Sequence, residues 1–170
     1  FTIAPEPLPF FQTLLPAQFS SARAGAIFEW RGDTEAMEVG RRVADGRGAA
    51  LVIDYGHMES GIGETFQAVG RHAYADPLTA PGALDLTAHV DFQALSRAVE
   101  AMGAKGFGPI EQSQFLRRLG IEQRAASLKA KGARADDIDQ ALARLIGRER
   151  TAMGELFKVA AFMHHSIGTP

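Results

Sequence analysis

The residues best suited to chemistry stand together at the end of an apolar run. Asp54 and Tyr55 lie near the end of the stretch at residues 49–56 and His57 follows it directly, so a carboxylate, a phenol and an imidazole stand close together in the chain. An apolar run without alternation is typical of a strand covered on both faces in a parallel sheet, and ligands gather beyond the carboxyl ends of such strands. Gly56 permits a sharp backbone turn there. The pattern predicts a site, although Asp54 could instead cap backbone groups while Tyr55 packs.

A second polar cluster lies at residues 85–91. It brackets the predicted start of a helix, where exposed N–H groups and the helix dipole favour an anion or developing negative charge. Asp91 stands directly before the apolar stripe of the predicted helix, a position that is typical of a helix cap. His89 remains the open candidate in this cluster.

Other kinds of site are poorly supported. His57, His72 and His89 are spaced irregularly and there is no cysteine, so we predict no metal site. The segment at residues 61–63 resembles the start of a dinucleotide fingerprint, but Phe66 takes the place of the third glycine and no strand leads into it. There is no nucleophile elbow of the form G-x-S-x-G.

The elements that must position these residues alternate between strands and helices. Helices are predicted at residues 34–44, 92–102, 113–119, 122–131 and 136–148, and strands at 26–30, 49–56, 105–110 and 155–163. Residues 5–16 contain four prolines and are predicted to form a packed connector, and residues 57–88 a long ordered loop. This order predicts an α/β layer fold with a parallel sheet and helices on its faces.

Composition limits the partners. A formal charge of -2 and a pI near 6.2 provide no excess of basic residues, which argues against nucleic acid and acidic membrane surfaces. No apolar stretch is long enough to cross a bilayer, and no signal-peptide pattern opens the chain. The chain starts at Phe1 without an initiator methionine, and we expect a soluble fragment of a longer protein.

Several linked motifs resemble the MidA family, which includes the mitochondrial complex I assembly-factor methyltransferase. The resemblance covers nearly the whole chain beyond Gly25. It is carried by residues 51–57 (LVIDYGH), 63–68 (GETFQA), 74–78 (YADPL), 85–92 (DLTAHVDF), 108–109 (GP), Gln112, 115–116 (FL), 119–121 (LGI) and 153–159 (MGELFKV).

The resemblance implies the C-terminal part of a class I methyltransferase, whose Rossmann-like sheet ends in an antiparallel strand. Residues 51–55 would form the fifth strand, 105–110 the sixth and 156–163 the antiparallel seventh. On this basis the chain is one part of a single domain. It would contain a connector and short strand (1–32), a sheet core with the long loop 57–88 (33–110), a helical insertion (111–150) and a closing strand with its tail (151–170).

The implied activity is methyl transfer from S-adenosyl-L-methionine to a protein arginine. The family's glycine-rich cofactor loop, the acidic residue after its second strand and the acidic loop after its fourth strand are not found here. The cofactor-binding residues are therefore unknown and expected in a missing N-terminal half.

The acceptor side is what this sequence would supply. We expect Asp54, Tyr55, His57 and His89 to be catalytic, and Gly56, Gln67, Thr87 and Asp91 to contact the substrate. The expected partner is a protein substrate, which the resemblance suggests is a respiratory complex I subunit, and the chain could form a homodimer. The expected compartment is the cytoplasm of a bacterium, or the mitochondrion if the source is a eukaryote. The alternative is a non-catalytic module that binds proteins or assists the assembly of a respiratory complex.

Overall fold

The structure of the chain, a computed structural model, describes residues 6, 9–71, 73–79 and 82–167. The chain divides into two compact units. Residues 1–32 and 61–89 make the first unit, and residues 33–60 and 90–170 make the second.

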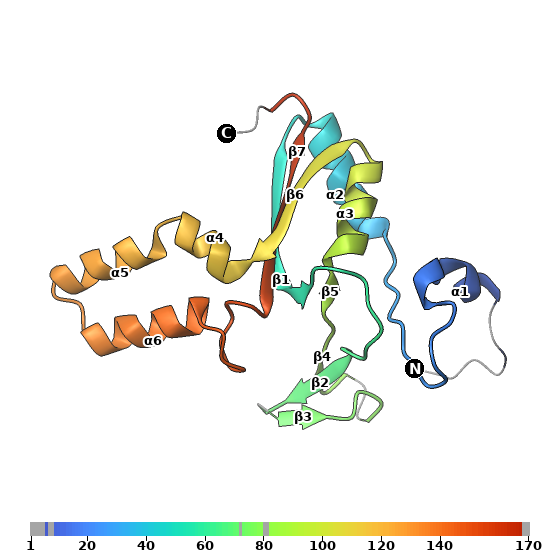
Figure 1. Ribbon diagram of the computed structural model, residues 1–170, viewed down its shortest axis with the longest axis horizontal. Helices are drawn as coiled ribbons and strands as arrows, with labels where there is room; N and C mark the ends of the chain where they lie inside the picture. Colours follow the sequence, from blue (N-terminus) through green and yellow to red (C-terminus); the bar gives the residue numbers. More distant parts are fainter. Residues whose placement is uncertain (1–5, 7–8, 72, 80–81, 168–170) are drawn as a thin grey trace. The chain divides into compact units, whose positions relative to one another are not determined.

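The second unit is built on a mixed sheet with the strand order β5-β1-β7-β6 (Figure 1). Its strands are β1 (Ala49–His57), β5 (Val90–Asp91), β6 (Ala104–Glu111) and β7 (Phe157–His164). β7 runs antiparallel to both β1 and β6, and β5 runs parallel to β1. The predicted α/β class with an antiparallel closing strand is therefore confirmed.

Helices α2 (Thr34–Asp45) and α3 (Phe92–Ala101) lie side by side on this sheet (Figure 1). The buried core between helices and sheet consists of Val43, Phe92, Val99, Ala104, Ala160 and Phe162. Burying one phenylalanine side chain contributes roughly 1.5–3 kcal/mol, and Phe92 and Phe162 are both fully buried. The helical stripe read from the sequence therefore faces the core as predicted.

The other face of β1 is open among the described residues. Ala50 and Val52 pack toward the core, whereas Leu51 is 53% exposed and Ile53 is 45% exposed. β5 pairs with β1 only at Gly56 and His57, so the preceding part of that edge has no strand partner in the described chain. The described chain covers one face of this strand, and the covering of its second face stays a prediction for the longer protein.

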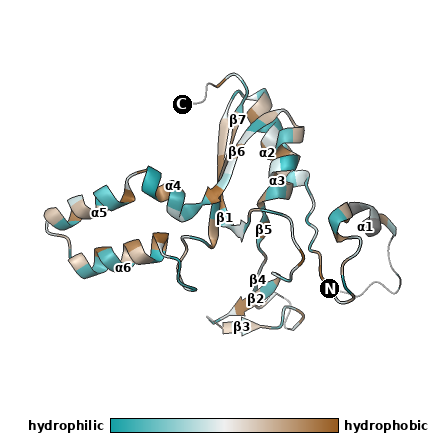
Figure 2. Ribbon diagram, viewed as in Figure 1, coloured by the Kyte–Doolittle hydropathy of each residue, from teal (hydrophilic) through white to brown (hydrophobic). Residues whose placement is uncertain are grey.

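Three helices follow β6: α4 (Gln112–Arg118), α5 (Ile121–Ala130) and α6 (Ala135–Ile146). Hydrophobic and hydrophilic residues mix along α5 and α6, which pack against each other (Figure 2). The helix predicted at residues 113–119 starts earlier, with Glu111 at the cap position and Ser113 buried in the first turn. Leu119, the last residue of the predicted helix, is 68% exposed, because α4 ends at Arg118 and Gly120 then turns the chain at φ 80°.

The first unit contains α1 (Pro9–Leu14), a short 3-10 turn (Ala17–Phe19) and a small antiparallel sheet with the order β3-β2-β4. Its strands are β2 (Gln67–Gly70), β3 (Ala73–Ala75) and β4 (Asp85–Thr87). Residues 57–88 were predicted to be a long ordered loop without a helix or strand, and these three strands correct that prediction. Strands of three or four residues contain too little alternation to be seen in a sequence.

Two further predictions fail in the first unit. Residues 9–14 form a helix instead of an irregular connector, because Pro9 occupies its first position, where a missing N–H costs nothing. Residues 26–30 are not a strand. The Ile27 carbonyl accepts a hydrogen bond from the Gly63 N–H (2.9 Å), and the Glu29 side chain accepts from the Thr65 and Phe66 amides.

Candidate functional site

The carboxyl end of β1 carries the first group of predicted residues. Oδ1 of Asp54 accepts a hydrogen bond from the Tyr55 backbone N–H at 2.8 Å, and the Tyr55 ring meets Phe157 edge-on with centroids 5.6 Å apart. Both features belong to the structural alternative, in which Asp54 caps and Tyr55 packs. Among the described residues the second oxygen of Asp54 accepts no hydrogen bond, so this carboxylate keeps acceptor capacity for a ligand.

His57 is held in a defined tautomer. Its Nδ1 lies 2.7 Å from the Glu59 carbonyl oxygen. A carbonyl oxygen can only accept, so Nδ1 carries the hydrogen and the neutral ring presents a lone pair at Nε2. The half-buried imidazole is therefore arranged to accept a proton at Nε2.

Gly56 does not form the sharp turn expected of it, since the strand continues through His57. A Cβ at this position would lie 2.2 Å from the Val90 carbonyl oxygen, and the Gly56 N–H donates to the Leu156 carbonyl at 3.2 Å. The glycine is required because the backbones of β1 and β5 approach closely. Its predicted contact with substrate stays a prediction.

Asp91 lies beside His57 in the β1–β5 pair. Its Oδ1 accepts from the Ala94 N–H at 2.9 Å as the cap of α3. The capping role read from the sequence is confirmed, and this side chain is committed to the helix.

The remaining predicted residues lie in the first unit. Gln67 and Thr87 face each other in the β2–β4 pair, so the sheet that was missed in the sequence brings these two together. The Thr87 hydroxyl is buried without a hydrogen-bond partner among the described residues. The His89 backbone N–H donates to the Thr65 hydroxyl at 3.0 Å.

Glu29 organises this part of the first unit and was missed as a functional residue. Its carboxylate accepts hydrogen bonds from the Thr65 N–H (2.9 Å), the Phe66 N–H (2.7 Å) and the Thr65 hydroxyl. Burial opposes its ionisation, but these hydrogen bonds and Arg31 hold the pKa of the Glu29 carboxyl below its ordinary value. Since the Thr65 hydroxyl also receives the His89 amide, Glu29 positions the backbone at His89. In the sequence, the signal that could have identified Glu29 was a single acidic residue within an apolar stretch.

Lys158 and Glu111 were also missed. In the sheet register Lys158 on β7 stands opposite Asp54 on β1 and opposite Glu111 on β6. Burial lowers the pKa of Lys158, against the opposing effect of Glu111 and Glu155, and its ammonium donates to the Glu155 and Leu156 carbonyls. The carboxyl edge of the sheet therefore carries two carboxylates on either side of one ammonium.

The described residues do not fit the adenosine cofactor that the sequence resemblance implies. Such a cofactor is held where a strand turns through glycines into a helix. Strand leads directly into helix at Asp91-Phe92 and at Glu111-Gln112, with no glycine at either junction. We assign no described residue to the cofactor.

Metal ligands and membrane spans were also sought in the part of the chain that the structure describes. No group of three or more His, Cys, Asp or Glu residues is placed there to hold a metal ion, and His72 lies outside the described residues. Within the same residues, no helix has the length and apolar character needed to span a membrane.

Comparisons with known proteins agree on a single family. Residues 1–110 match the family model described as "Putative S-adenosyl-L-methionine-dependent methyltransferase". The mitochondrial protein arginine methyltransferase NDUFAF7 of Rattus norvegicus is 39% identical over 133 residues, which are 76% of this chain and 29% of the relative. The human protein of the same name is 38% identical over 145 residues, 84% of this chain and 30% of the relative.

Solved structures from Burkholderia thailandensis are also similar. One, described as a "likely methyl transferase" bound to S-adenosyl-homocysteine, has a TM-score of 0.68 and 32% identity. The match covers 81% of this chain and 36% of that protein's chain. Another, of an uncharacterized protein, has a TM-score of 0.69 and 33% identity. The match covers 81% of this chain and 38% of that protein's chain.

The chain thus spans about three tenths of the length of the curated relatives that it matches. The match to the family model covers most of its residues, and both the identity to the relatives and the folds of the solved structures agree with it. The chain belongs to the family of S-adenosyl-L-methionine-dependent methyltransferases that this model describes.

Proposed function

We propose that this chain supplies the methyl-acceptor side of an S-adenosyl-L-methionine-dependent protein arginine methyltransferase. The observation that carries the proposal is the carboxyl edge of the sheet, where Asp54 keeps a free carboxylate oxygen and His57 presents Nε2. The relatives named as protein arginine methyltransferases support the choice of arginine as acceptor.

The chemistry required of the acceptor side is modest. A guanidinium must be oriented, and its nitrogen must lose one proton when it gains a methyl group. A carboxylate binds a guanidinium by charge-assisted hydrogen bonds, which is the role proposed for Asp54. A base near the nitrogen removes the proton, which is the role proposed for His57 Nε2. Tyr55 and His89 are proposed to be further catalytic residues. Gly56, Gln67, Thr87 and Asp91 are proposed to contact the substrate, and these assignments rest on the sequence resemblance.

The open face of β1 supports a division of labour within a longer enzyme. Leu51 and Ile53 expose large apolar side chains in the middle of a strand. Exposed apolar surface of this kind marks a contact with other polypeptide. We assign the covering of this face, and the binding of the methyl donor, to polypeptide equivalent to the rest of the relatives' length.

The substrate and compartment follow from the same proposal. The acceptor is a protein, and the relatives' name gives the mitochondrion as their compartment. We propose the mitochondrion for a eukaryotic source and the cytoplasm for a bacterial one. A respiratory complex I subunit is the candidate acceptor that the sequence resemblance supplies.

The test measures transfer of a radioactive methyl group by the complete enzyme that carries this sequence. His57→Asn keeps an amide donor for the Glu59 carbonyl but has no basic nitrogen. Since general-base catalysis contributes roughly 10²–10⁴-fold, we expect a loss of at least about 100-fold in kcat. Asp54→Asn, which removes the charge that orients the guanidinium, should mainly raise KM for the acceptor.

The matched controls are His165→Asn in the exposed tail and Asp136→Asn on the exposed face of α6. Both should leave the transfer rate unchanged. Wild-type rates in both site variants would contradict the proposed roles. If calorimetry showed that the complete protein does not bind S-adenosyl-L-methionine, the proposed methyl transfer would be wrong and the non-catalytic assembly function would be favoured.

A further inference from the structure

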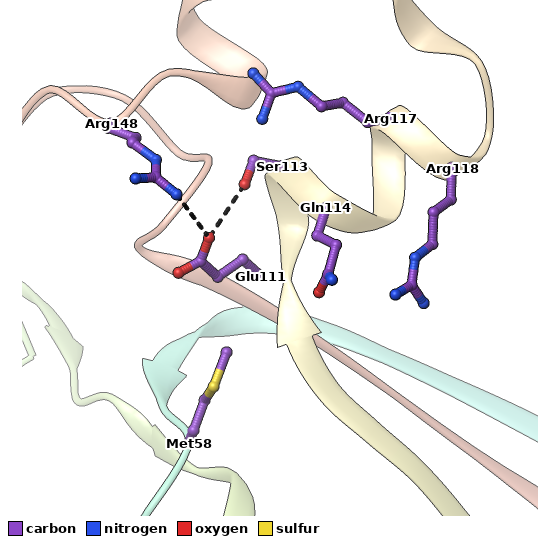
Figure 3. A pocket seen from close by; sticks show the side chains of 7 residues that line it. All are labelled: Met58, Glu111, Ser113, Gln114, Arg117, Arg118 and Arg148. Atoms are coloured by element: carbon purple, nitrogen blue, oxygen red, sulfur yellow. Dashed lines mark hydrogen bonds and ion pairs between the residues drawn. The ribbon is translucent and has the colours of Figure 1, made fainter.

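A cavity of about 450 Å³ opens within the second unit, at the carboxyl ends of two strands (Figure 3). Met58 follows β1 directly, and Glu111 is the last residue of β6. The lining also includes Ser113 and three arginines, Arg117, Arg118 and Arg148. Three guanidinium groups and one carboxylate give the lining a formal charge of +2 in a chain whose net charge is -2.

The guanidinium groups of the cavity are available to a ligand. Arg118 has no ion-pair partner among the described residues. Arg117 pairs with Glu122 at 3.2 Å and Arg148 with Glu155 at 3.1 Å, but these glutamates lie outside the lining, with side chains 54% and 46% exposed. Ion pairs this exposed to water are weak, so an incoming carboxylate exchanges with them at little cost.

The carboxylate within the lining restricts the ligand. Glu111 accepts from the Ser113 hydroxyl at 3.3 Å and lies 3.9 Å from Arg148. It repels a doubly charged phosphate more strongly than a singly charged carboxylate, and the chain's negative net charge disfavours a polyanion. Arginines bind carboxylates through paired hydrogen bonds, and Met58 offers apolar contact to the methylene groups of an acidic side chain.

The sheet register relates this cavity to the proposed acceptor position. Asp54, Lys158 and Glu111 form one row across β1, β7 and β6. Neighbouring strands are about 4.8 Å apart, so Asp54 and Glu111 are separated by roughly 10 Å at the backbone. An extended peptide advances about 3.3 Å per residue and crosses this distance in about three residues.

The geometry points to a specificity pocket that holds an aspartate or glutamate side chain about three residues from the arginine to be methylated. The ligand is therefore an acidic segment of the acceptor protein. This inference rests on the proposed function for the arginine, whereas the capture of the carboxylate rests on the cavity alone.

The experiment measures fluorescence anisotropy of labelled peptides with the 170-residue chain, without cofactor or turnover. One peptide carries glutamates three residues before and after a central arginine, and its partner carries glutamines at both places. We expect the glutamate peptide to bind about tenfold more tightly than the glutamine peptide. Charge-assisted hydrogen bonds to a partly exposed site give an affinity ratio of about this size. Arg118→Glu and Arg148→Gln should each remove most of this preference.

The control is Arg124→Glu, which changes the charge by the same amount as Arg118→Glu at an exposed arginine of α5 outside the lining. It should keep the preference. Equal binding of the two peptides, or an equal loss in Arg124→Glu, would overturn the pocket. Displacement of the glutamate peptide by millimolar inorganic phosphate would also overturn it, in favour of a phosphate site.

A third peptide separates this inference from the proposed function. It keeps both glutamates and replaces the arginine by glutamine. If glutamates are preferred but the arginine contributes nothing, the pocket stands and the acceptor site at Asp54 fails. If binding requires the arginine and Asp54 but not the glutamates, the acceptor site stands and the pocket is wrong.

Discussion

At the scale of single residues, the candidate site is a set of polar groups whose roles differ more than their types suggest. Asp54 and Asp91 are both aspartates beside the end of β1. Asp91 caps α3, whereas Asp54, among the described residues, accepts a hydrogen bond only from its neighbour's amide and keeps one oxygen for a ligand. Spacing along the sequence identified the cap, because a cap is a local interaction. It could not find Glu29, whose partners lie 36 and 37 residues away.

Glu29→Gln is predicted to destabilise the chain. The substitution replaces hydrogen bonds to a carboxylate by weaker ones to a neutral amide, at a cost of about 1–3 kcal/mol at pH 7. The pKa of Glu29 is lowered in the folded chain, so its contribution is complete above the unfolded pKa and is lost as pH falls through the folded pKa. The stability difference between wild type and variant should therefore shrink below about pH 4.3, the ordinary pKa of glutamate.

Urea unfolding at pH 7 and pH 3 measures this difference. Glu64→Gln, at an exposed glutamate of the same unit, should cost nothing at either pH. A difference between Glu29→Gln and wild type that stayed constant with pH would contradict the role given to the charge.

At the scale of elements, the ends of helices and the approach of strands position the candidate groups. α3 begins beside His57 because Asp91 closes its first turn, and β5 lies against β1 because Gly56 has no side chain. The sequence predicted helices α2, α3, α5 and α6 well because their apolar residues recur over several turns. It missed β2, β3 and β4, which are too short for any period to be seen.

Asp91→Ala should lower the free energy of unfolding by about 1 kcal/mol, the usual cost of losing a helix cap. Asp33 occupies the same position on α2 but makes no capping bond with its side chain. Asp33→Ala should therefore have no measurable effect. Equal losses in the two variants, measured by thermal unfolding, would show that the Asp91–Ala94 bond contributes nothing.

Gly56→Ala is expected to be costly in a different way. The new Cβ would lie 2.2 Å from a backbone oxygen of β5, which cannot yield as a flexible side chain would. Overpacking of this kind costs typically about 1–3 kcal/mol. Gly48→Ala, just before β1, meets no atom within 4 Å and should be tolerated. Denaturant midpoints of the two variants compare them directly, and equal midpoints would refute the close approach.

At the scale of the whole molecule, the exposed face of β1 is the feature that the described chain leaves incomplete. The helices cover one face of the sheet, while Leu51 and Ile53 expose apolar surface on the other. The relatives are more than three times as long as the segments that they share with this chain. We therefore propose this surface as the contact for the polypeptide that, in the proposed function, holds the methyl donor.

A double variant, Leu51→Lys with Ile53→Lys, tests this contact. In the 170-residue chain the unfolding temperature should change little, because both side chains are already about half exposed. In the complete enzyme the same changes should lower the unfolding temperature by several degrees, since burying an unpaired charge is expensive. Leu119→Lys, at a more exposed leucine, should be silent in both. An unchanged unfolding temperature of the double variant in the complete enzyme would show that the contact lies elsewhere.

The longer strands and helices of the second unit (without the two-residue strand β5), the cap at Asp91 and the cluster at the end of β1 were determined by the sequence alone. All three depend on residues close together in the chain, where periodicity and capping act. The register that places Lys158 opposite both Asp54 and Glu111, the two amides and one hydroxyl held by the Glu29 carboxylate, and the arginine-lined cavity were decided only by the tertiary structure. Each brings together side chains from distant segments, and no local pattern encodes such a meeting.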